Sequence, residues 1–212
     1  MTAINEPERK ATNWLAQQGV EPVSLKRMSG YTNHVFLVTQ ESAQDSVLRL
    51  ANPESGAGFC PLAHDTTRVC KMHQQAAELG LAPGLMATDI PAGVMWLKYA
   101  GEPQRVTRDN FGGLQDMLHR LHHSGFNWAE SGGQAADGAG LGYLEQLIHS
   151  VDDSAQPDRV LARHYAQQLY QLGEQRGYAD YPLVPVHSDL NPGNCLYDKV
   201  RNRWFMIDWD FA

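Results

Sequence analysis

The chain has 212 residues, a formal net charge of −7 and 42 % hydrophobic residues. This length suits one large domain or two small lobes, and the apolar share with mixed charges is that of a globular protein rather than a disordered chain. The negative charge, without any basic run, argues against a nucleic-acid binder, so we expect no nucleic-acid partner.

Cysteine usage and the N-terminus bear on the cellular location. Cys60, Cys70 and Cys195 show no paired spacing and leave one cysteine over. They fit a reducing environment better than a disulfide framework, which predicts a cytoplasmic protein. The polar N-terminus is unlike a signal peptide, and no apolar run approaches membrane-spanning length, so we expect no membrane partner.

The first half of the chain reads as a helix, three strands, a second helix and a hairpin. Pro7 suits the first turn of the first helix, and Gly19 and Gly80 suit the residues that end the two helices. The predicted helices span 6–18 and 65–79, and the predicted strands span 23–27, 34–39, 46–50, 85–89 and 94–99. Residues 52–63, with several Pro and Gly, predict a loop, and Gly101-Glu102-Pro103 predicts a boundary.

The second half is mainly helical by pattern. Apolar residues at helical spacing predict a helix over 108–123, with Thr107 as its cap. Residues 124–140 are rich in Gly, Ala and Ser and predict a loop. Two further helices are predicted over 141–150 and 157–176, with their apolar residues in the core.

Two short polar segments lie near the end of the sequence. Val186–Asn194 contains His187, Asp189 and Asn194, and Met206–Asp210 contains Asp208. Residues 195–197 and 204–207 predict a hairpin between these segments. Antiparallel pairing returns Asn194, at the hairpin entrance, and Asp208, at its exit, to the same end of the hairpin.

These residue types suit phosphoryl transfer. A carboxylate can orient and deprotonate a hydroxyl, while an amide oxygen and a second carboxylate can hold Mg²⁺ on the phosphates of a nucleotide. Mg²⁺ binds few protein ligands and prefers hard oxygen donors, so one Asn and one Asp suffice. The alternative interpretation is a polar loop ahead of an edge hairpin.

The two segments resemble the catalytic loop and the metal-binding motif of the choline/ethanolamine kinase and aminoglycoside phosphotransferase superfamily. The resemblance covers the chain from about residue 20 to the end. It implies an α+β, protein-kinase-like fold of two lobes. The N-lobe, residues 1–100, is expected to hold an antiparallel sheet and a helix. The C-lobe, residues 101–212, is expected to be mostly helical, with the catalytic hairpin.

The resemblance also implies a nucleotide site between the lobes. The connection at 29–33 looks like the family's phosphate-covering loop, so the backbone at Gly30, Thr32 and Asn33 is expected to cover the phosphates of ATP. Lys98 and Tyr99 are expected to lie in the hinge whose backbone meets adenine. A plain hairpin turn is the alternative for the loop.

Arg49 is the one cation in an otherwise apolar strand. The resemblance implies that it neutralises phosphate charge, and the alternative is an outward-facing residue on an edge strand. In the family, a glutamate on the following helix pairs with this cation. No acid stands near Val69, where we expect it, because Asp65 is too early and Glu78 too late.

In the mechanism that the resemblance implies, Asp189 takes the proton of the acceptor hydroxyl, and Asn194 and Asp208 hold Mg²⁺. His187 is expected to brace the loop. Asp210 is expected to shape the site or to attract a cationic substrate. Trp209 either offers its ring to a quaternary ammonium or lies in the core.

Three functions remain open from the sequence. The first is a kinase for choline, ethanolamine, thiamine or a similar small-molecule alcohol, and the second is an aminoglycoside-type phosphotransferase. The third is a truncated, catalytically impaired module that binds nucleotide. The chain ends at Ala212, before the helices that follow in the family. We therefore expect either a fragment or truncated gene product, or a C-lobe that is completed by a partner chain. That partner is a second copy in a homo-oligomer or a different protein.

Overall fold

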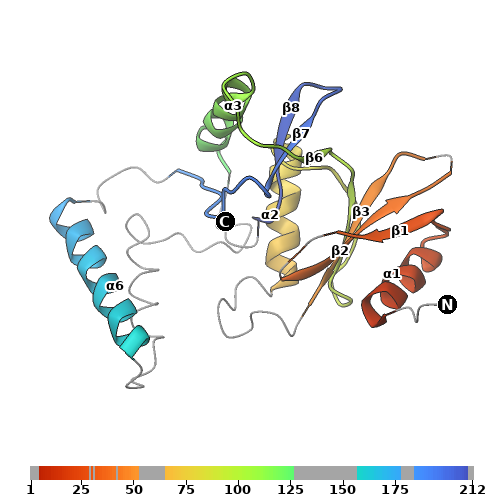
Figure 1. Ribbon diagram of the computed structural model, residues 1–212, viewed down its shortest axis with the longest axis horizontal. Coiled ribbons are helices and arrows are strands. Elements are labelled where there is room, and N and C mark those ends of the chain that lie inside the picture. Colours follow the sequence, from red (N-terminus) through yellow and green to blue (C-terminus); the bar gives the residue numbers. More distant parts are fainter. Residues whose placement is uncertain are drawn as a thin grey trace. The chain divides into compact units, whose positions relative to one another are not determined.

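The computed structural model describes residues 5–28, 30, 32–41, 43–52, 65–126, 157–177 and 184–209. The chain divides into two compact units, Met1–Gly133 with Pro185–Ala212 and Gln134–Val184. The first unit contains α1 (Glu6–Gln17), β1 (Ser24–Arg27), β2 (Asn33–Thr39), β3 (Ser46–Ala51), α2 (Thr66–Glu78), β4 (Leu85–Asp89), β5 (Val94–Lys98), β6 (Glu102–Pro103), α3 (Phe111–His122), β7 (Cys195–Asp198) and β8 (Arg203–Met206) (Figure 1). The second unit contains α6 (Pro157–Gln175).

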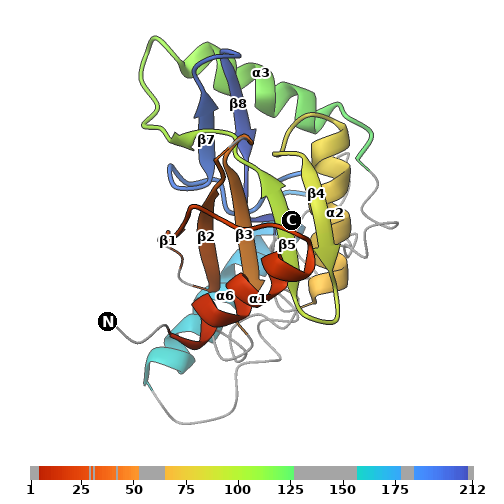
Figure 2. The ribbon, with the colours of Figure 1, turned by 90° about the vertical axis from the view of Figure 1, so that its right-hand side faces the viewer.

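Five antiparallel strands form the larger sheet, in the order β1-β2-β3-β5-β4 (Figure 2). One face is covered by α1, which begins where Asn5 Oδ1 accepts the Glu8 N–H at 3.0 Å. Because side chains alternate along a strand, Leu48 and Leu50 of β3 reach this face and join the core around Trp14 of α1. The predicted strands and first helix are confirmed within one or two residues.

The other face of this sheet is covered by α2, so α1 and α2 lie on opposite sides (Figure 1). Val69 and Cys70 of α2 pack with Met95 and Leu97 of β5, the residues that alternate with those facing α1. The helix starts at the predicted place, where Asp65 Oδ1 accepts the Arg68 N–H at 3.1 Å. Each face of the sheet therefore carries an apolar cluster and is covered by its own helix.

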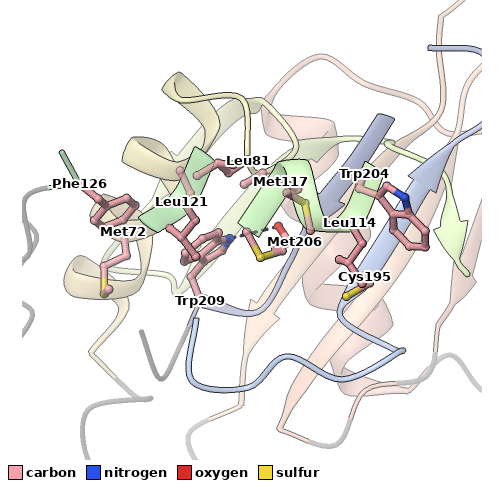
Figure 3. Packing of buried hydrophobic residues seen from close by; sticks show 12 residues of the cluster. Met72, Leu81, Leu114, Met117, Leu121, Phe126, Cys195, Trp204, Met206 and Trp209 are labelled. Atoms are coloured by element: carbon pink, nitrogen blue, oxygen red, sulfur yellow. Dashed lines mark hydrogen bonds between the residues drawn. The ribbon is translucent and has the colours of Figure 1, made fainter. Parts of the chain in front are cut away.

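A smaller antiparallel sheet, β6-β7-β8, contains the predicted hairpin. The core beneath it combines residues of α2, α3, β7 and β8, with Trp209 at 1 % exposure (Figure 3). The indole of Trp209 stacks on Phe126 at 5.8 Å between ring centroids, and its Nε1 donates to Met206 O at 3.1 Å (Figure 3). Packing of this kind fixes where the chain runs immediately after β8.

The prediction for α3 was wrong at its start. The helix begins at Phe111, not at residue 108, and Thr107 does not cap it. Instead, the Thr107 N–H donates to Asn110 Oδ1 at 2.7 Å, and Trp204 Nε1 donates to Asn110 O at 3.1 Å. Thr and Asn both favour helix starts, so the sequence offers two candidates, and the contact with Trp204 selects the later one.

The helix predicted over 157–176 is confirmed as α6. The predicted helix over 141–150 and most of the loops predicted over 52–63 and 124–140 lie outside the described residues. The predicted boundary between lobes falls between β5 and β6, and it remains a prediction. Among the helices that the structure describes, none combines the length and apolarity needed to cross a bilayer.

Candidate active site

Asp189 is held by two amide side chains from its own loop. Its Oδ2 accepts Asn194 Nδ2 at 2.9 Å, and its Oδ1 accepts Asn191 Nδ2 at 3.1 Å. Asn194 Nδ2 also donates to the main-chain oxygen of Asp189 at 3.0 Å. Asp189 is half-buried and Asn194 is buried, so the contact between them is partly shielded from solvent. The loop therefore presents a carboxylate in one defined orientation.

His187 ties this loop to the segment that follows β8. Its ring lies 4.6 Å from that of Trp209 between centroids, in an edge-on arrangement, and its Nε2 donates to Ile207 O at 2.9 Å. The proton must be on Nε2, because a carbonyl oxygen can only accept. Buried at 3 % exposure, His187 lies where a bracing residue is expected.

Asn194 and Asp208 lie at the same end of the hairpin. Cys195 pairs with Met206, and the Ile207 N–H donates to Asn194 O at 3.0 Å, one residue before Asp208. Asp208 and Ser188 both have positive φ, at 66° and 61°. Non-glycine residues rarely take this conformation, and it persists where surrounding structure imposes it, often at functional sites.

The donor set at this end of the hairpin fits Mg²⁺. Asn194 Nδ2 is directed at two oxygens of Asp189, so the amide oxygen of Asn194 points away from Asp189. The amide oxygen of Asn194 and the carboxylate of Asp208, two residues that the hairpin returns to the same end, are hard oxygen ligands of the kind that Mg²⁺ prefers. Asp210, the other acid of this segment, lies outside the described residues.

Gly30, in the connection between β1 and β2, lies close to the start of β2. A Cβ at Gly30 would lie 2.9 Å from Asn33 O and 3.5 Å from Val35 Cγ2, so this position has no room for a side chain. Thr32 Oγ1 accepts Asn33 Nδ2 at 3.0 Å. Val35 pairs across the strands with Arg49, so Gly30, next to the Val35 side chain, lies on the same face of the sheet as Arg49.

Arg49 does not lie on an edge strand, because β3 is the central strand of the sheet. It points to the face covered by α2, and its Nη1 donates to Met95 Sδ at 3.4 Å. Val69, the position where an acid was expected, is buried in the apolar cluster with Met95. His73, one turn later on α2, lies close enough for the Arg49 charge to lower its pKa.

Lys98 and Tyr99 leave the sheet at the end of β5. The Lys98 N–H donates to Gly84 O at 2.8 Å and the Tyr99 N–H to Asp45 O at 3.3 Å, so both amides already have partners. The Tyr99 hydroxyl donates to Glu102, and burial followed by this contact raises the pKa of Tyr99 to about 12. In the described part of the chain, the Ala100 N–H makes no backbone hydrogen bond, unlike those of Lys98 and Tyr99.

The segment after β5 continues into β6, which pairs directly with β7. Gly101 has φ of 102°, and a Cβ there would lie 2.5 Å from Tyr197 O. We expect Gly101→Ala to lower the free energy of unfolding by about 2 kcal/mol, because it adds a clash with backbone to an unfavourable conformation. Urea unfolding measures this loss, with Gly112→Ala, where a Cβ would meet nothing within 4 Å, as the control. Equal stability of the two variants would contradict the expectation.

The end of α2 is also fastened to the hairpin. Arg203 Nη2 donates to Gly80 O, and the Met206 N–H donates to Leu81 O at 2.7 Å. Leu81 packs in the same core as Trp209. The helix that lies beside Arg49 is therefore joined to the strand that leads to Asp208.

The structure brings some predicted residues together and separates one from the site. Asp189 and Asn194 are in direct contact, and the hairpin places Asp208 at their end. Trp209 is a core residue, the second of its two interpretations, because its ring is buried against Phe126 and His187. Its ring therefore has no free face for a ligand.

Two residues gained significance only from the structure. Asn191 contacts the Asp189 carboxylate, although Asn-Pro-Gly in the sequence indicates only a turn. His73 lies close enough for the Arg49 charge to lower its pKa, and the only signal in the sequence is its position one helical turn after Val69.

Solved structures with the same fold come from several small-molecule kinases. The chain is similar to a choline kinase from Streptococcus pneumoniae, with 14 % identity over 98 % of this chain and 69 % of that one, and a TM-score of 0.70. An ethanolamine kinase from Plasmodium vivax gives 15 % identity, 98 % and 63 % coverage and a TM-score of 0.68. A macrolide 2'-phosphotransferase from Brachybacterium faecium gives 15 % identity over 94 % of this chain and 71 % of that one, and a TM-score of 0.60.

These likenesses show an α+β, kinase-like fold, and the chain spans 63 to 71 % of the length of the three proteins. A comparison with curated proteins gave no match. A model of the phosphotransferase enzyme family matches residues 24–212, nearly the whole chain, and the chain therefore belongs to this phosphotransferase family.

Proposed function

We propose that the protein transfers the γ-phosphoryl group of ATP to a hydroxyl of a small molecule, with Mg²⁺ as its cofactor. The observation that carries the proposal is the end of the β7–β8 hairpin. There the Asp189 carboxylate is held by Asn194, and Asp208 follows the residue that bonds to Asn194 O. A base beside two hard oxygen ligands is the arrangement that phosphoryl transfer uses.

In this function Asp189 orients the acceptor hydroxyl and takes its proton. Asn194 and Asp208 hold Mg²⁺, which neutralises charge on the phosphates. His187 keeps the loop against the segment after β8 through its bond to Ile207 O. Since these residues position and stabilise rather than form covalent bonds, the catalysis is mainly orientation and electrostatics.

The nucleotide is assigned to the face of the large sheet that carries Arg49. Gly30 allows the backbone of its loop to approach phosphates, and Arg49 supplies positive charge on the same face. The Ala100 N–H is the hinge donor for the adenine ring, since those of Lys98 and Tyr99 are occupied. Two similar kinases support the use of a nucleotide, because the Streptococcus pneumoniae choline kinase binds AMP and the amicoumacin kinase binds AMP-PNP.

The acceptor is proposed to be choline, ethanolamine, thiamine or a similar amino alcohol. The similar structures include choline and ethanolamine kinases, which favours this class. The second candidate is an antibiotic hydroxyl, because macrolide phosphotransferases share the fold. The test is ATP consumption with Mg²⁺ across amino alcohols, aminoglycosides and macrolides. Stimulation by an antibiotic alone would reject the amino-alcohol class, and no stimulation by any of them would reject both classes.

A nucleotide-binding module without turnover is the other candidate function. It is favoured by the position of Val69, an apolar residue where the family's helix acid is expected beside Arg49. Thermal shift with MgATP separates the candidates when it is combined with the consumption assay. Stabilisation by MgATP without consumption in any acceptor mixture would establish the binding module instead of the kinase.

Asp208→Ala is expected to weaken binding of Mg·AMP-PNP by about tenfold, because the metal loses a carboxylate ligand. Binding of AMP-PNP in EDTA should change little, since the remaining contacts do not involve the metal. Calorimetry measures both affinities. Asp109→Ala, which removes an exposed carboxylate before α3, is the control. An unchanged Mg²⁺-dependent affinity in Asp208→Ala would remove Asp208 from the metal site.

A further inference from the structure

We propose that Asn191 is a positioning residue that aims Asp189 Oδ1 at the acceptor hydroxyl. The inference rests on the proposed function, and it adds a residue that neither binds the metal nor takes the proton. Asn191 is exposed and lies two residues after Asp189, in the turn that leads to Asn194. Its side chain makes contacts in two directions, and these fix how it acts.

The first contact determines which way the amide of Asn191 faces. Its Oδ1 accepts the Gly193 N–H at 2.8 Å. A backbone N–H can only donate, so the atom facing Gly193 must be the oxygen of the amide. The amide nitrogen therefore faces the other way, where it lies 3.1 Å from Asp189 Oδ1. Gly193 leaves room for this arrangement, because a Cβ there would lie 3.1 Å from Asn191 Oδ1.

The second contact completes the support of the carboxylate. Asn194 Nδ2 holds Oδ2 on the buried side, and Asn191 Nδ2 holds Oδ1 on the exposed side. With one donor on each oxygen, rotation of the carboxylate about its last bond would break at least one hydrogen bond. If only Asn194 held the carboxylate of Asp189, the carboxylate could rotate while it kept its single hydrogen bond to Asn194 Nδ2.

The exposed side is also the side from which a soluble acceptor arrives. A carboxylate oxygen can accept more than one hydrogen bond, and Asn191 occupies one position on Oδ1. The remaining acceptor position on Oδ1 is thereby directed to one place, where the hydroxyl of the acceptor is to lie. Misplacing a reacting group by about 1 Å can reduce a rate by about a hundredfold.

Asn191→Asp separates this role from a simple role in the turn. The aspartate has the same shape and can still accept the Gly193 N–H, but it cannot donate to Asp189. We expect kcat for MgATP consumption, measured with the acceptor that stimulates it most, to fall about 10- to 100-fold in Asn191→Asp and Asn191→Ala. The KM for MgATP and the affinity for Mg·AMP-PNP should stay within about threefold of wild type, because Asn194 and Asp208 are unchanged.

Asn202→Asp is the matched control. It makes the same change at an exposed asparagine in the turn at the other end of the hairpin, where Asn202 accepts the Tyr197 hydroxyl through an oxygen that aspartate retains. Its kcat should equal that of wild type. A loss of kcat in Asn191→Ala but not in Asn191→Asp would show a role in the turn alone and would overturn the inference. An equal loss of kcat in Asn202→Asp would also overturn it, since added charge would then explain the effect.

The proposed function and the inference fail in distinguishable ways. Wild-type protein that neither binds Mg·AMP-PNP nor consumes ATP with any acceptor would overturn both. Active wild-type protein with normal kcat in both Asn191 variants would overturn the inference alone. A rise in KM for MgATP at unchanged kcat would also overturn it, because that pattern indicates nucleotide binding rather than alignment of the base.

Discussion

Asp189→Ala is expected to lower kcat by about 10³- to 10⁴-fold while Mg·AMP-PNP binds within about threefold of wild type. The loss follows from removal of the base that takes the acceptor proton. Retention of binding follows from a contact that the substitution spares. Asn194 Nδ2 donates to the main-chain oxygen of residue 189 at 3.0 Å as well as to the carboxylate, so Asn194 stays oriented toward the metal. Single-turnover rates and calorimetry measure the two quantities separately.

A matched change on the same hairpin provides the control for Asp189→Ala. In the far turn Asp198 accepts hydrogen bonds from the Arg201 N–H, the Arg201 guanidinium and the Val200 N–H, and these contacts lower the pKa of its carboxyl. Asp198→Ala should therefore lower the free energy of unfolding. Its kcat, measured at a temperature well below unfolding, should equal that of wild type. If Asp189→Ala kept more than about a tenth of the wild-type kcat, Asp189 would not be the base. If it lost nucleotide binding as well, the two roles assigned to Asp189 and Asn194 would not be separable.

The parts of the site that the sequence predicted are those fixed by backbone pairing. Strands 195–198 and 203–206 pair with each other, so the residues just outside them, Asn194 and Asp208, must meet at one end. The alternation of side chains along a strand likewise placed Arg49 on the opposite face of the sheet from Leu48 and Leu50. Neither conclusion requires knowledge of side-chain contacts, which explains why a single sequence sufficed.

The parts that the sequence did not predict depend on contacts between distant segments. The start of α3 is set by Trp204, far away in the chain, which bonds to Asn110 O. The orientation of the Asn191 amide depends on the Gly193 N–H, and an asparagine in a turn has several partners available. The burial of Trp209 depends on α3 and Phe126. Local pattern has no information about any of these.

His73 leads to the second large expected effect, a loss of about 3 kcal/mol in the free energy of unfolding as pH falls from 6.5 to 4. Burial lowers the pKa of His73 from 6.5 to about 4, with the Arg49 charge acting in the same direction and the bond to Pro83 O opposing both. Between these pH values the unfolded chain binds a proton that the folded protein does not. Stability therefore decreases as pH falls through this range, and it is fully retained above 6.5.

His73→Gln is the variant that isolates this effect. A glutamine can keep a donor near Pro83 O, which His73 Nε2 contacts at 2.8 Å, and it does not titrate. Urea unfolding at pH 7, 5.5 and 4 measures the difference in free energy of unfolding between wild type and His73→Gln. This difference should shift by about 3 kcal/mol in favour of the variant as pH falls from 7 to 4. If the variant is less than about 3 kcal/mol less stable than wild type at pH 7, it becomes the more stable protein at pH 4. His122→Gln, at an exposed position on α3, controls for the loss of one histidine. Parallel stabilities of wild type and His73→Gln across pH would contradict the prediction.

Arg49→Met distinguishes the two causes of the low His73 pKa. Burial is the larger cause, so removing the Arg49 charge should leave most of the acid loss in place. A large reduction of the loss would mean that charge repulsion dominates and that α2 packs less tightly than the structure shows. Because the same helix covers the Arg49 face of the sheet and is fastened to β8 at Leu81, protonation of His73 disturbs the packing on which both halves of the proposed site depend. Acid should therefore weaken Mg·AMP-PNP binding in wild type over the same pH range, and less so in His73→Gln.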